Sequence, residues 1–116
     1  ETPETKNLIN HKRLDLLKPS CGIVNIGRQS AMDYGVLCKK LKNKEIAGAI
    51  LDVFTPEPIG TNSDIWDTPN LIITPHVSAD DGESYVRLTL DLFIKNLQLF
   101  ISNKKLVNQI DKGFGY

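Results

Sequence analysis

The chain has 116 residues, of which 41% are hydrophobic and 24% are charged, and its 14 Lys and Arg residues balance 14 Asp and Glu residues. Because nucleic acids and anionic membranes bind surfaces with an excess of basic residues, a net charge of zero predicts neither as a partner. No apolar run reaches the roughly 18 residues that a membrane-spanning helix needs. This composition predicts one soluble globular unit.

The start of the chain argues against a secreted protein, and its few cysteines argue against a disulfide-rich protein. The first residues, ETPETKNLIN, lack the basic and apolar regions of a secretory signal, and the chain begins with Glu1 rather than Met. We therefore expect a piece of a longer, cytoplasmic protein. Cys21 and Cys38 are too few for a disulfide framework, and with two histidines they show no spacing typical of metal ligands, so no metal site is expected.

Helix and strand signals alternate along the first part of the chain. Residues 10–18 place leucines at helical spacing and stop at Pro19, which predicts a short helix. Residues 21–26 form a short apolar run with β-branched side chains, as in a parallel strand that is buried on both faces. Residues 33–44 have apolar side chains on one side and lysines on the other, which predicts an amphipathic helix.

Two more strands and a long helix follow. The strands are predicted over 46–54 and 71–74, and a proline follows each of them. Residues 81–103 predict a helix whose polar side chains form one narrow line: Ser84, Arg87, Asp91, Lys95, Gln98 and Ser102. A helix with so narrow a polar stripe is expected to pack on more than one side, against a second domain or subunit.

The order of these elements predicts the fold class. Strands separated by long helical or loop crossovers are typical of α/β proteins with a parallel, doubly wound, Rossmann-like sheet. Three such strands leave apolar faces and an edge uncovered, so we expect part of a larger domain, followed by a long C-terminal helix.

Charged residues follow each predicted strand, at the edge where open α/β sheets bind ligands. The first strand leads to Gly27 and Arg28, the second contains Asp52 and leads to Glu57, and the third leads to His76. Singly, the arginine, the glutamate and the histidine could each be an ordinary solvated or ion-paired group. An aspartate in an apolar strand needs a polar partner or ligand. Their convergence on one edge predicts a site.

Several strings of the sequence resemble a known family. They are TPET at 2–5, LLKPSCGIVNIGR at 16–28, AGAILDVFTPEP at 47–58 and IWDTPNLIITPH at 65–76. In order and spacing they are similar to the D-isomer-specific 2-hydroxyacid dehydrogenases, and the resemblance covers nearly the whole chain. It implies a cytoplasmic, homodimeric oxidoreductase that transfers a hydride between NAD or NADP and a small 2-hydroxy or 2-keto acid of the glyoxylate or hydroxypyruvate kind.

The resemblance also implies roles for single residues. Arg28 matches the arginine that holds the substrate carboxylate, while His76 and Glu57 match the catalytic histidine and its glutamate. These residue types suit the chemistry, because an imidazolium supplies a proton near neutral pH, a neighbouring carboxylate favours the charged ring, and a guanidinium binds a carboxylate at two points. The implied cofactor contacts are Ile26, Gly27, Arg28, Asp52, His76 and Ser78.

The sequence departs from the family pattern in three places. Gln29 stands where the family usually has glycine, Asp80 and Asp81 lie where a small residue and glycine often follow the histidine, and no G-x-G-x-x-G motif occurs. The resemblance therefore implies a C-terminal portion of the enzyme. In it, residues 1–80 form the second half of the cofactor-binding domain, and residues 81–116 form a crossover helix and tail that return to the substrate domain.

The sequence is compatible with three hypotheses about function. The first is an enzyme of which this chain, taken alone, is an inactive part. The second is a non-enzymatic regulatory or interaction module that retains the dehydrogenase fold, although the joint presence of Arg28, Glu57 and His76 argues against it. The third is a proteolytic piece that pairs its open strand edge or its apolar helix with a second copy.

Overall fold

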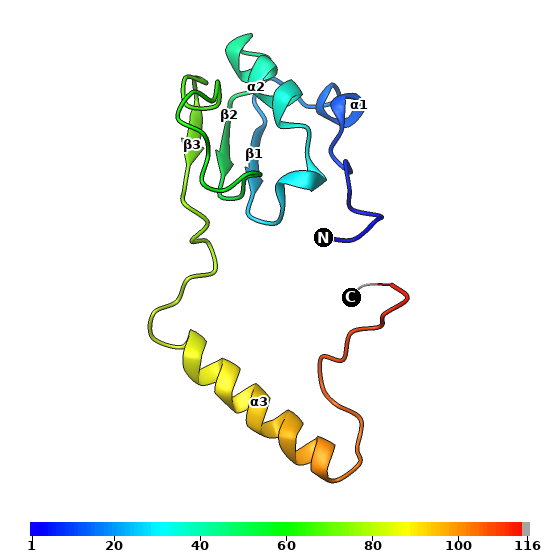
Figure 1. Ribbon diagram of the computed structural model, residues 1–116. Coiled ribbons are helices and arrows are strands. Elements are labelled where there is room, and N and C mark those ends of the chain that lie inside the picture. Colours follow the sequence, from blue (N-terminus) through cyan, green and yellow to red (C-terminus); the bar gives the residue numbers. More distant parts are fainter. Residues whose placement is uncertain (115–116) are drawn as a thin grey trace. The chain divides into compact units, whose positions relative to one another are not determined.

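The computed structural model describes residues 1–114, which belong to two units, Glu1–Ser78 and Ala79–Tyr116 (Figure 1). The last two residues of the predicted tail, 115–116, lie outside the described residues. The assignment of residues 1–80 and 81–116 to two parts of an enzyme stays a prediction.

The first unit is built on a three-stranded parallel sheet in the order β1-β2-β3 (Figure 1). The strands are β1 (Gly22–Asn25), β2 (Gly48–Leu51) and β3 (Leu71–Ile73). This sheet confirms the predicted α/β class and the predicted parallel arrangement of the strands. The strand expected over 46–54 is too long at both ends, because β2 pairs with β1 and β3 only between Gly48 and Leu51.

Two helices of the first unit begin at side-chain caps. The side chain of Asn10 accepts a hydrogen bond from the Arg13 N–H at the start of α1 (His11–Leu14), and that of Asp33 accepts one from the Val36 N–H at the start of α2 (Tyr34–Lys42). Such caps satisfy N–H groups that have no partner within the helix. The helix α1 is shorter than the predicted 10–18, since its C-cap is already Asp15.

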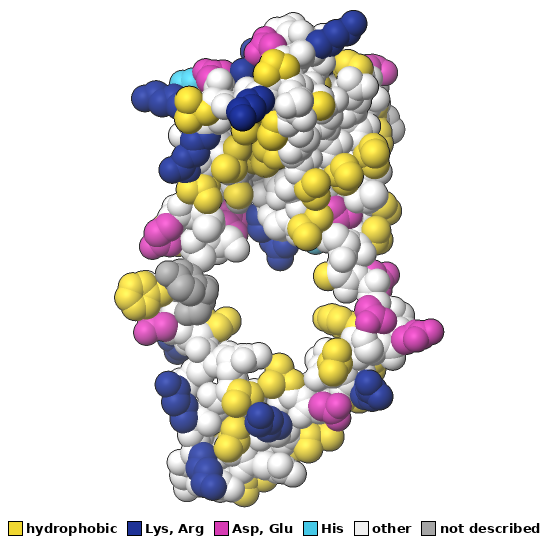
Figure 2. Space-filling model, turned by 180° about the vertical axis from the view of Figure 1, so that it is seen from behind, with side chains coloured by type: hydrophobic (Ala, Val, Ile, Leu, Met, Phe, Trp, Pro, Cys, Tyr) yellow, Lys and Arg dark blue, Asp and Glu magenta, His cyan; other side chains and the backbone are white. Residues whose placement is uncertain are grey.

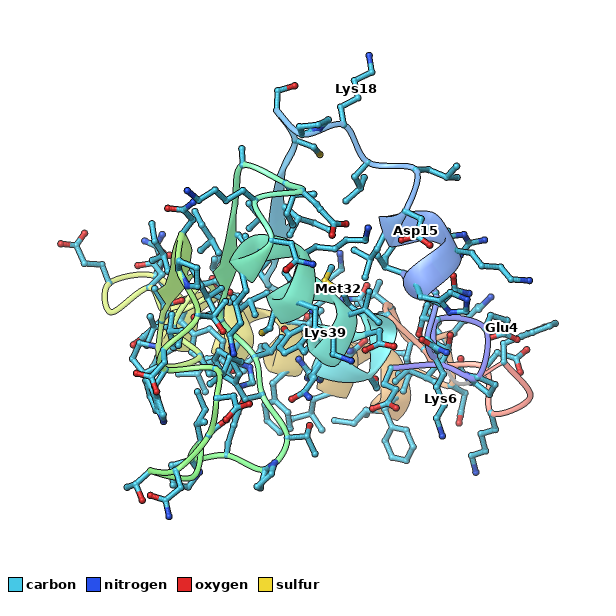
Figure 3. All side chains as sticks on the ribbon, turned by 90° about the horizontal axis from the view of Figure 1, so that it is seen from above. Glu4, Lys6, Asp15, Lys18, Met32 and Lys39 are labelled. Carbon is cyan, nitrogen blue, oxygen red and sulfur yellow. The ribbon has the colours of Figure 1, made fainter. Side chains whose placement is uncertain are left out.

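An ion pair joins these two helices. Asp15, labelled in Figure 3, follows α1, and its carboxylate lies 2.7 Å from Nζ of Lys40 in α2. The same ammonium group lies 2.9 Å from the carboxylate of Glu45. Because the two carboxylates are exposed, we expect this pairing to contribute little to stability compared with the apolar core between the helices and the sheet.

The core lies on one face of the sheet. Leu14 of α1, Leu37 and Leu41 of α2, and Leu51 of β2 are completely buried there. The opposite face carries Val24, Ile50 and Ile72, which are paired in register across the three strands and are 59%, 37% and 58% exposed. The prediction that the strands are buried on both faces is therefore wrong for this unit, because its helices pack on one side of the sheet only.

The second unit consists of α3 (Tyr85–Ile101) and the tail that follows it (Figure 1). Asn96 fixes the tail to the helix, since its Nδ2 donates to the Val107 carbonyl at 3.2 Å and its Oδ1 accepts from the Val107 N–H at 2.9 Å. No residue of α3 is buried, and hydrophobic side chains lie at the surface of both units (Figure 2). Within residues 1–114, no helix has both the length and the hydropathy that crossing a membrane requires.

Candidate active site

The loops that follow the three strands bring the predicted catalytic residues to one edge of the sheet. Because the strands are parallel and in register, their carboxyl ends lie side by side. Arg28 follows β1, Glu57 follows β2 and His76 follows β3, and all three line one cavity of about 200 Å³. Three residues that are distant in the sequence therefore share one site, as the strand-end argument predicts.

A hydrogen bond joins the glutamate to the histidine. Oε2 of Glu57 lies 2.9 Å from Nδ1 of His76, and Oε1 of the same carboxylate accepts the Phe54 N–H at 2.6 Å. The bond to His76 and then the one from Phe54 hold the pKa of Glu57 below its ordinary value, and the charge of Arg28 adds to the effect. An ionised Glu57 makes Nδ1 the donor, which leaves Nε2 as the ring nitrogen available to a substrate.

The turn that carries His76 has an uncommon backbone conformation. His76 has a φ of 57°, in the left-handed region that side chains other than glycine seldom adopt. Its N–H donates to the Thr74 carbonyl at 3.0 Å. Such a conformation persists only where neighbouring groups hold it in place, and it aims the imidazole from the end of β3.

Asp52 is the group that holds this turn. Its carboxylate, 1% exposed, accepts the Thr74 hydroxyl at 2.5 Å and the N–H groups of Val77 and Ser78, each at 2.9 Å. The hydrogen bond from Thr74, followed by those from Ser78 and Val77, keeps the pKa of Asp52 well below its usual range. Asp52 is therefore an ionised, internally satisfied group that anchors the residues on both sides of His76.

Arg28 lines the same cavity as His76. Its Nη1 donates to the carbonyl of Gly27 at 2.7 Å, and its side chain is exposed. A guanidinium has five N–H donors in a planar fork, so one bond to the backbone leaves donors for a carboxylate. The site thus combines a cation that can bind an anion with an acid–base pair.

A second cavity, of about 450 Å³, adjoins the same glutamate and histidine. Its other walls are mainly apolar and include Phe54, Trp66 and Ile73. The indole N–H of Trp66 donates to the Gly60 carbonyl at 2.9 Å, which fixes the ring within its own loop. The exposed Glu57–His76 pair therefore borders a mainly apolar cavity on one side.

The end of β1 suits a cofactor that approaches the backbone. Ile26 is 59% exposed there. A Cβ atom placed on Gly27 would meet only Oδ1 of Asn25, at 3.5 Å, which is ordinary van der Waals contact. Nothing in the described structure thus requires glycine at this position, and its missing side chain leaves space on the outer side. Ile26 and Gly27 accordingly fit an NAD or NADP molecule that lies across the carboxyl edge of the sheet.

Ser78, the remaining residue predicted for the site, contacts Asp52 rather than the catalytic side chains. Ser78 contributes its N–H to Asp52, so both residues support the turn around His76. Thr74 is not among the residues predicted for the site, although the pairing of Leu51 with Ile73 places Asp52 and Thr74 next to each other. Asn25 and Tyr34, whose side chains join the loops, are also not among them, and Gln29 stands out in the sequence only as a departure from the family pattern.

A parallel α/β sheet with charged groups at its carboxyl edge is the arrangement of dinucleotide-binding domains. Residues 1–78 match the family model of the D-isomer specific 2-hydroxyacid dehydrogenase, NAD binding domain. The chain therefore belongs to this family, which confirms the resemblance seen in the sequence. It also confirms NAD or NADP as the class of cofactor.

Relatives support this assignment over most of the chain. The chain is 36% identical over 110 residues to D-3-phosphoglycerate dehydrogenase of Synechocystis sp., covering 93% of this chain and 20% of that protein. It is 33% identical over 111 residues to glyoxylate reductase of Aeropyrum pernix, covering 96% of this chain and 33% of that protein.

A solved structure agrees with the fold. A D-isomer specific 2-hydroxyacid dehydrogenase from Xanthobacter autotrophicus, in complex with NADPH and MES, superimposes with a TM-score of 0.90 and 31% identity over 100% of this chain and 47% of that one. The chain thus spans less than half the length of each of these three proteins.

Proposed function

We propose that this chain supplies the acid–base and carboxylate-binding residues of an NAD- or NADP-dependent D-2-hydroxyacid dehydrogenase. The observation that carries the proposal is the 2.9 Å contact between Glu57 and His76 in the cavity that Arg28 also lines. The substrate is a small 2-keto acid of the glyoxylate or hydroxypyruvate kind. The name of the Aeropyrum pernix relative, glyoxylate reductase, supports this choice.

Each residue has a distinct task in this reaction. Arg28 binds the substrate carboxylate and orients the adjacent keto group. His76, charged beside the Glu57 carboxylate, gives a proton to the carbonyl oxygen as that carbon is reduced. The nicotinamide supplies the hydride when it is bound, and Ile26 and Gly27 lie where it would be held. Asp52 maintains the turn that positions His76.

We also propose that the chain by itself is inactive. It contains no G-x-G-x-x-G motif, which in dinucleotide-binding folds forms the turn around the pyrophosphate. It also spans only 33% of the glyoxylate reductase that it resembles. The catalytic side chains are therefore present without the groups that would bind the phosphates of the cofactor.

The experiment compares the complete protein that contains this chain with the chain alone. Each is assayed for oxidation of NADH or NADPH with glyoxylate and with hydroxypyruvate. The complete protein should turn over, and His76→Ala should lower kcat by roughly 10²- to 10⁴-fold, as expected for loss of a general acid. His11→Ala is the matched control, because His11 is exposed on α1.

Three outcomes would contradict parts of this proposal. Turnover that survives His76→Ala in the complete protein would refute the role of His76. Turnover by the chain alone that His76→Ala abolishes would refute its inactivity. A complete protein that oxidises neither cofactor with either acid would favour the non-enzymatic module instead.

We infer in addition that the complete protein is a cytoplasmic homodimer. Apolar side chains along α3, among them Phe93 at 62% exposed and Phe100 at 69%, support burial against another surface. The two free cysteines fit a reducing compartment. Light scattering of the purified protein tests the dimer, which a monomer at micromolar concentration would refute. Fractionation of cells tests the compartment, and recovery of the protein in a secreted or organellar fraction would refute it.

A further inference from the structure

The two loops that carry Arg28 and Glu57 separate soon after the sheet ends. The last register pair of β1 and β2 is Asn25 with Leu51, and one further backbone bond follows, from the Asp52 N–H to the Asn25 carbonyl at 3.0 Å. Beyond it, the sheet no longer fixes the distance between the arginine and the glutamate. A site that needs both residues therefore depends on side chains that join the loops.

A buried amide and a buried phenol make the first of these connections. Asn25 and Tyr34 are only 8% and 7% exposed. Nδ2 of Asn25 donates to the Arg28 carbonyl at 3.1 Å and to the Tyr34 hydroxyl at 2.9 Å, while its Oδ1 accepts the Gly27 N–H at 3.0 Å. The Asn25 side chain thus holds the loop that carries Arg28 and also donates a hydrogen bond to Tyr34.

Tyr34 extends this connection to the other loop. Its hydroxyl donates to the Val53 carbonyl at 2.9 Å, and its ring meets that of Phe54 edge to face, with 6.0 Å between the centroids. Burial is the main cause that raises the pKa of Tyr34 to about 12, so the hydroxyl keeps the proton that it donates. Phe54 in turn donates its N–H to the Glu57 carboxylate. The phenol therefore contacts the two residues directly before the Thr55–Pro58 turn.

Gln29 makes the second connection. It follows Arg28 in the chain, and its Oε1 accepts the N–H of Thr55, two residues before Glu57. Gln29, Thr55, Arg28 and Glu57 all line the cavity of about 200 Å³. One side chain thus links the neighbours of both functional residues at the wall of the site.

We propose that Gln29 and Tyr34 are positioning residues, which hold the Arg28 loop at a fixed distance from the loop that carries Glu57. The inference rests on the proposed function for the roles of Arg28 and Glu57. Neither side chain needs to touch the substrate, since each acts through the backbone of the residues that do. Their loss should therefore impair use of the keto acid more than binding of the cofactor.

The test uses Tyr34→Phe and Gln29→Met in the complete protein, because both variants keep the size of the side chain and remove its oxygen. Gln109→Met is the matched control for Gln29→Met, since Gln109 is exposed and lies in the tail beyond α3. Two quantities are measured: hydrogen–deuterium exchange over residues 53–59, and kcat and KM for the keto acid and for the cofactor.

Both variants should accelerate exchange over 53–59 and leave exchange in the core unchanged. They should lower kcat/KM for the keto acid by roughly 10- to 100-fold, as expected when reacting groups are misplaced, with little change in KM for the cofactor. Gln29→Glu retains an acceptor oxygen for the Thr55 N–H, and it should restore slow exchange over the same segment. The control variant should change neither quantity.

Hydrogen–deuterium exchange and kinetics together distinguish a failure of the positioning proposal from a failure of the proposed function. Unchanged exchange in both variants would overturn the proposal. Faster exchange with unchanged kinetics in an active protein would overturn it too, because the residues would then have only a structural role. If the wild-type protein had no activity while the exchange responded as expected, the loop connection would stand and the proposed function would fail.

Discussion

Nδ1 of His76 lies 2.9 Å from a carboxylate oxygen of Glu57, although the two residues are 19 positions apart in the chain. Two separate features produce this contact. The parallel pairing of β2 with β3 brings the loops to one edge, and the Phe54 N–H holds the other oxygen of the carboxylate. The histidine therefore meets a glutamate whose direction is already fixed.

This contact predicts a loss of activity when Glu57 becomes Gln in the complete protein. The amide keeps the shape of the side chain and loses the negative charge that keeps Nδ1 of His76 as a donor. A ring whose tautomer and direction are less well fixed is a poorer general acid, so kcat with glyoxylate at neutral pH should fall roughly tenfold or more. Steady-state kinetics with NADH or NADPH measure this change.

Glu4→Gln is the matched control for this variant, because Glu4, labelled in Figure 3, is exposed in the same unit. An unchanged kcat in Glu57→Gln would mean that the carboxylate does not position His76 for the reaction.

The bonds to Asp52 predict that stability depends on pH in the acidic range. Because folding lowers the pKa of Asp52 from its ordinary value of 3.8, its contribution is complete above that value and is lost as the pH falls toward the lowered pKa. Asp52→Asn should therefore lower the urea midpoint of the chain at pH 7. The difference from wild type should shrink below about pH 4.

Asp67→Asn is the control, since Asp67 is an exposed aspartate of the same unit. If the midpoint difference between wild type and Asp52→Asn were the same at pH 7 and pH 3, the charge of Asp52 would not be what anchors the turn.

Alanine substitutions of two leucines test where the core of the first unit lies. Leu37 is completely buried against the sheet, whereas Leu16 is 82% exposed. Leu37→Ala should cost about 2–5 kcal/mol of unfolding free energy, through lost burial and the cavity that remains. Leu16→Ala should change it by less than about 0.5 kcal/mol. Equal losses in urea titrations of the two variants would contradict the described core.

A substitution at Gly27 should affect cofactor binding without affecting the stability of the fold. The chain has room for a Cβ atom at this position, so Gly27→Ala should leave the free energy of unfolding nearly unchanged. If the cofactor lies against the backbone here, the same methyl group should raise its Kd roughly tenfold, which corresponds to about 1.4 kcal/mol. Titration of the complete protein with NADH and NADPH measures this. A Kd equal to that of wild type for both cofactors would place them elsewhere.

Much of the site could be predicted because parallel strands end at one edge of a sheet. That rule alone singled out Arg28, Glu57 and His76, and the structure places them around one cavity. It could not show that Asp52 is directed to the residues on both sides of His76, because an acid at a strand end can face either a ligand or its own chain. The distinction depends on the positions of single donor groups.

The sequence by itself determined the alternation of helices and strands, the α/β class and the types of residue at the strand ends. These features follow from local periodicity, from prolines and from the motifs shared with the family. The tertiary structure alone decided which sheet face is covered, how Asp52 is satisfied, and how Gln29 and Tyr34 reach across to Thr55 and Val53. Those outcomes depend on strand register and side-chain direction, which local patterns do not specify.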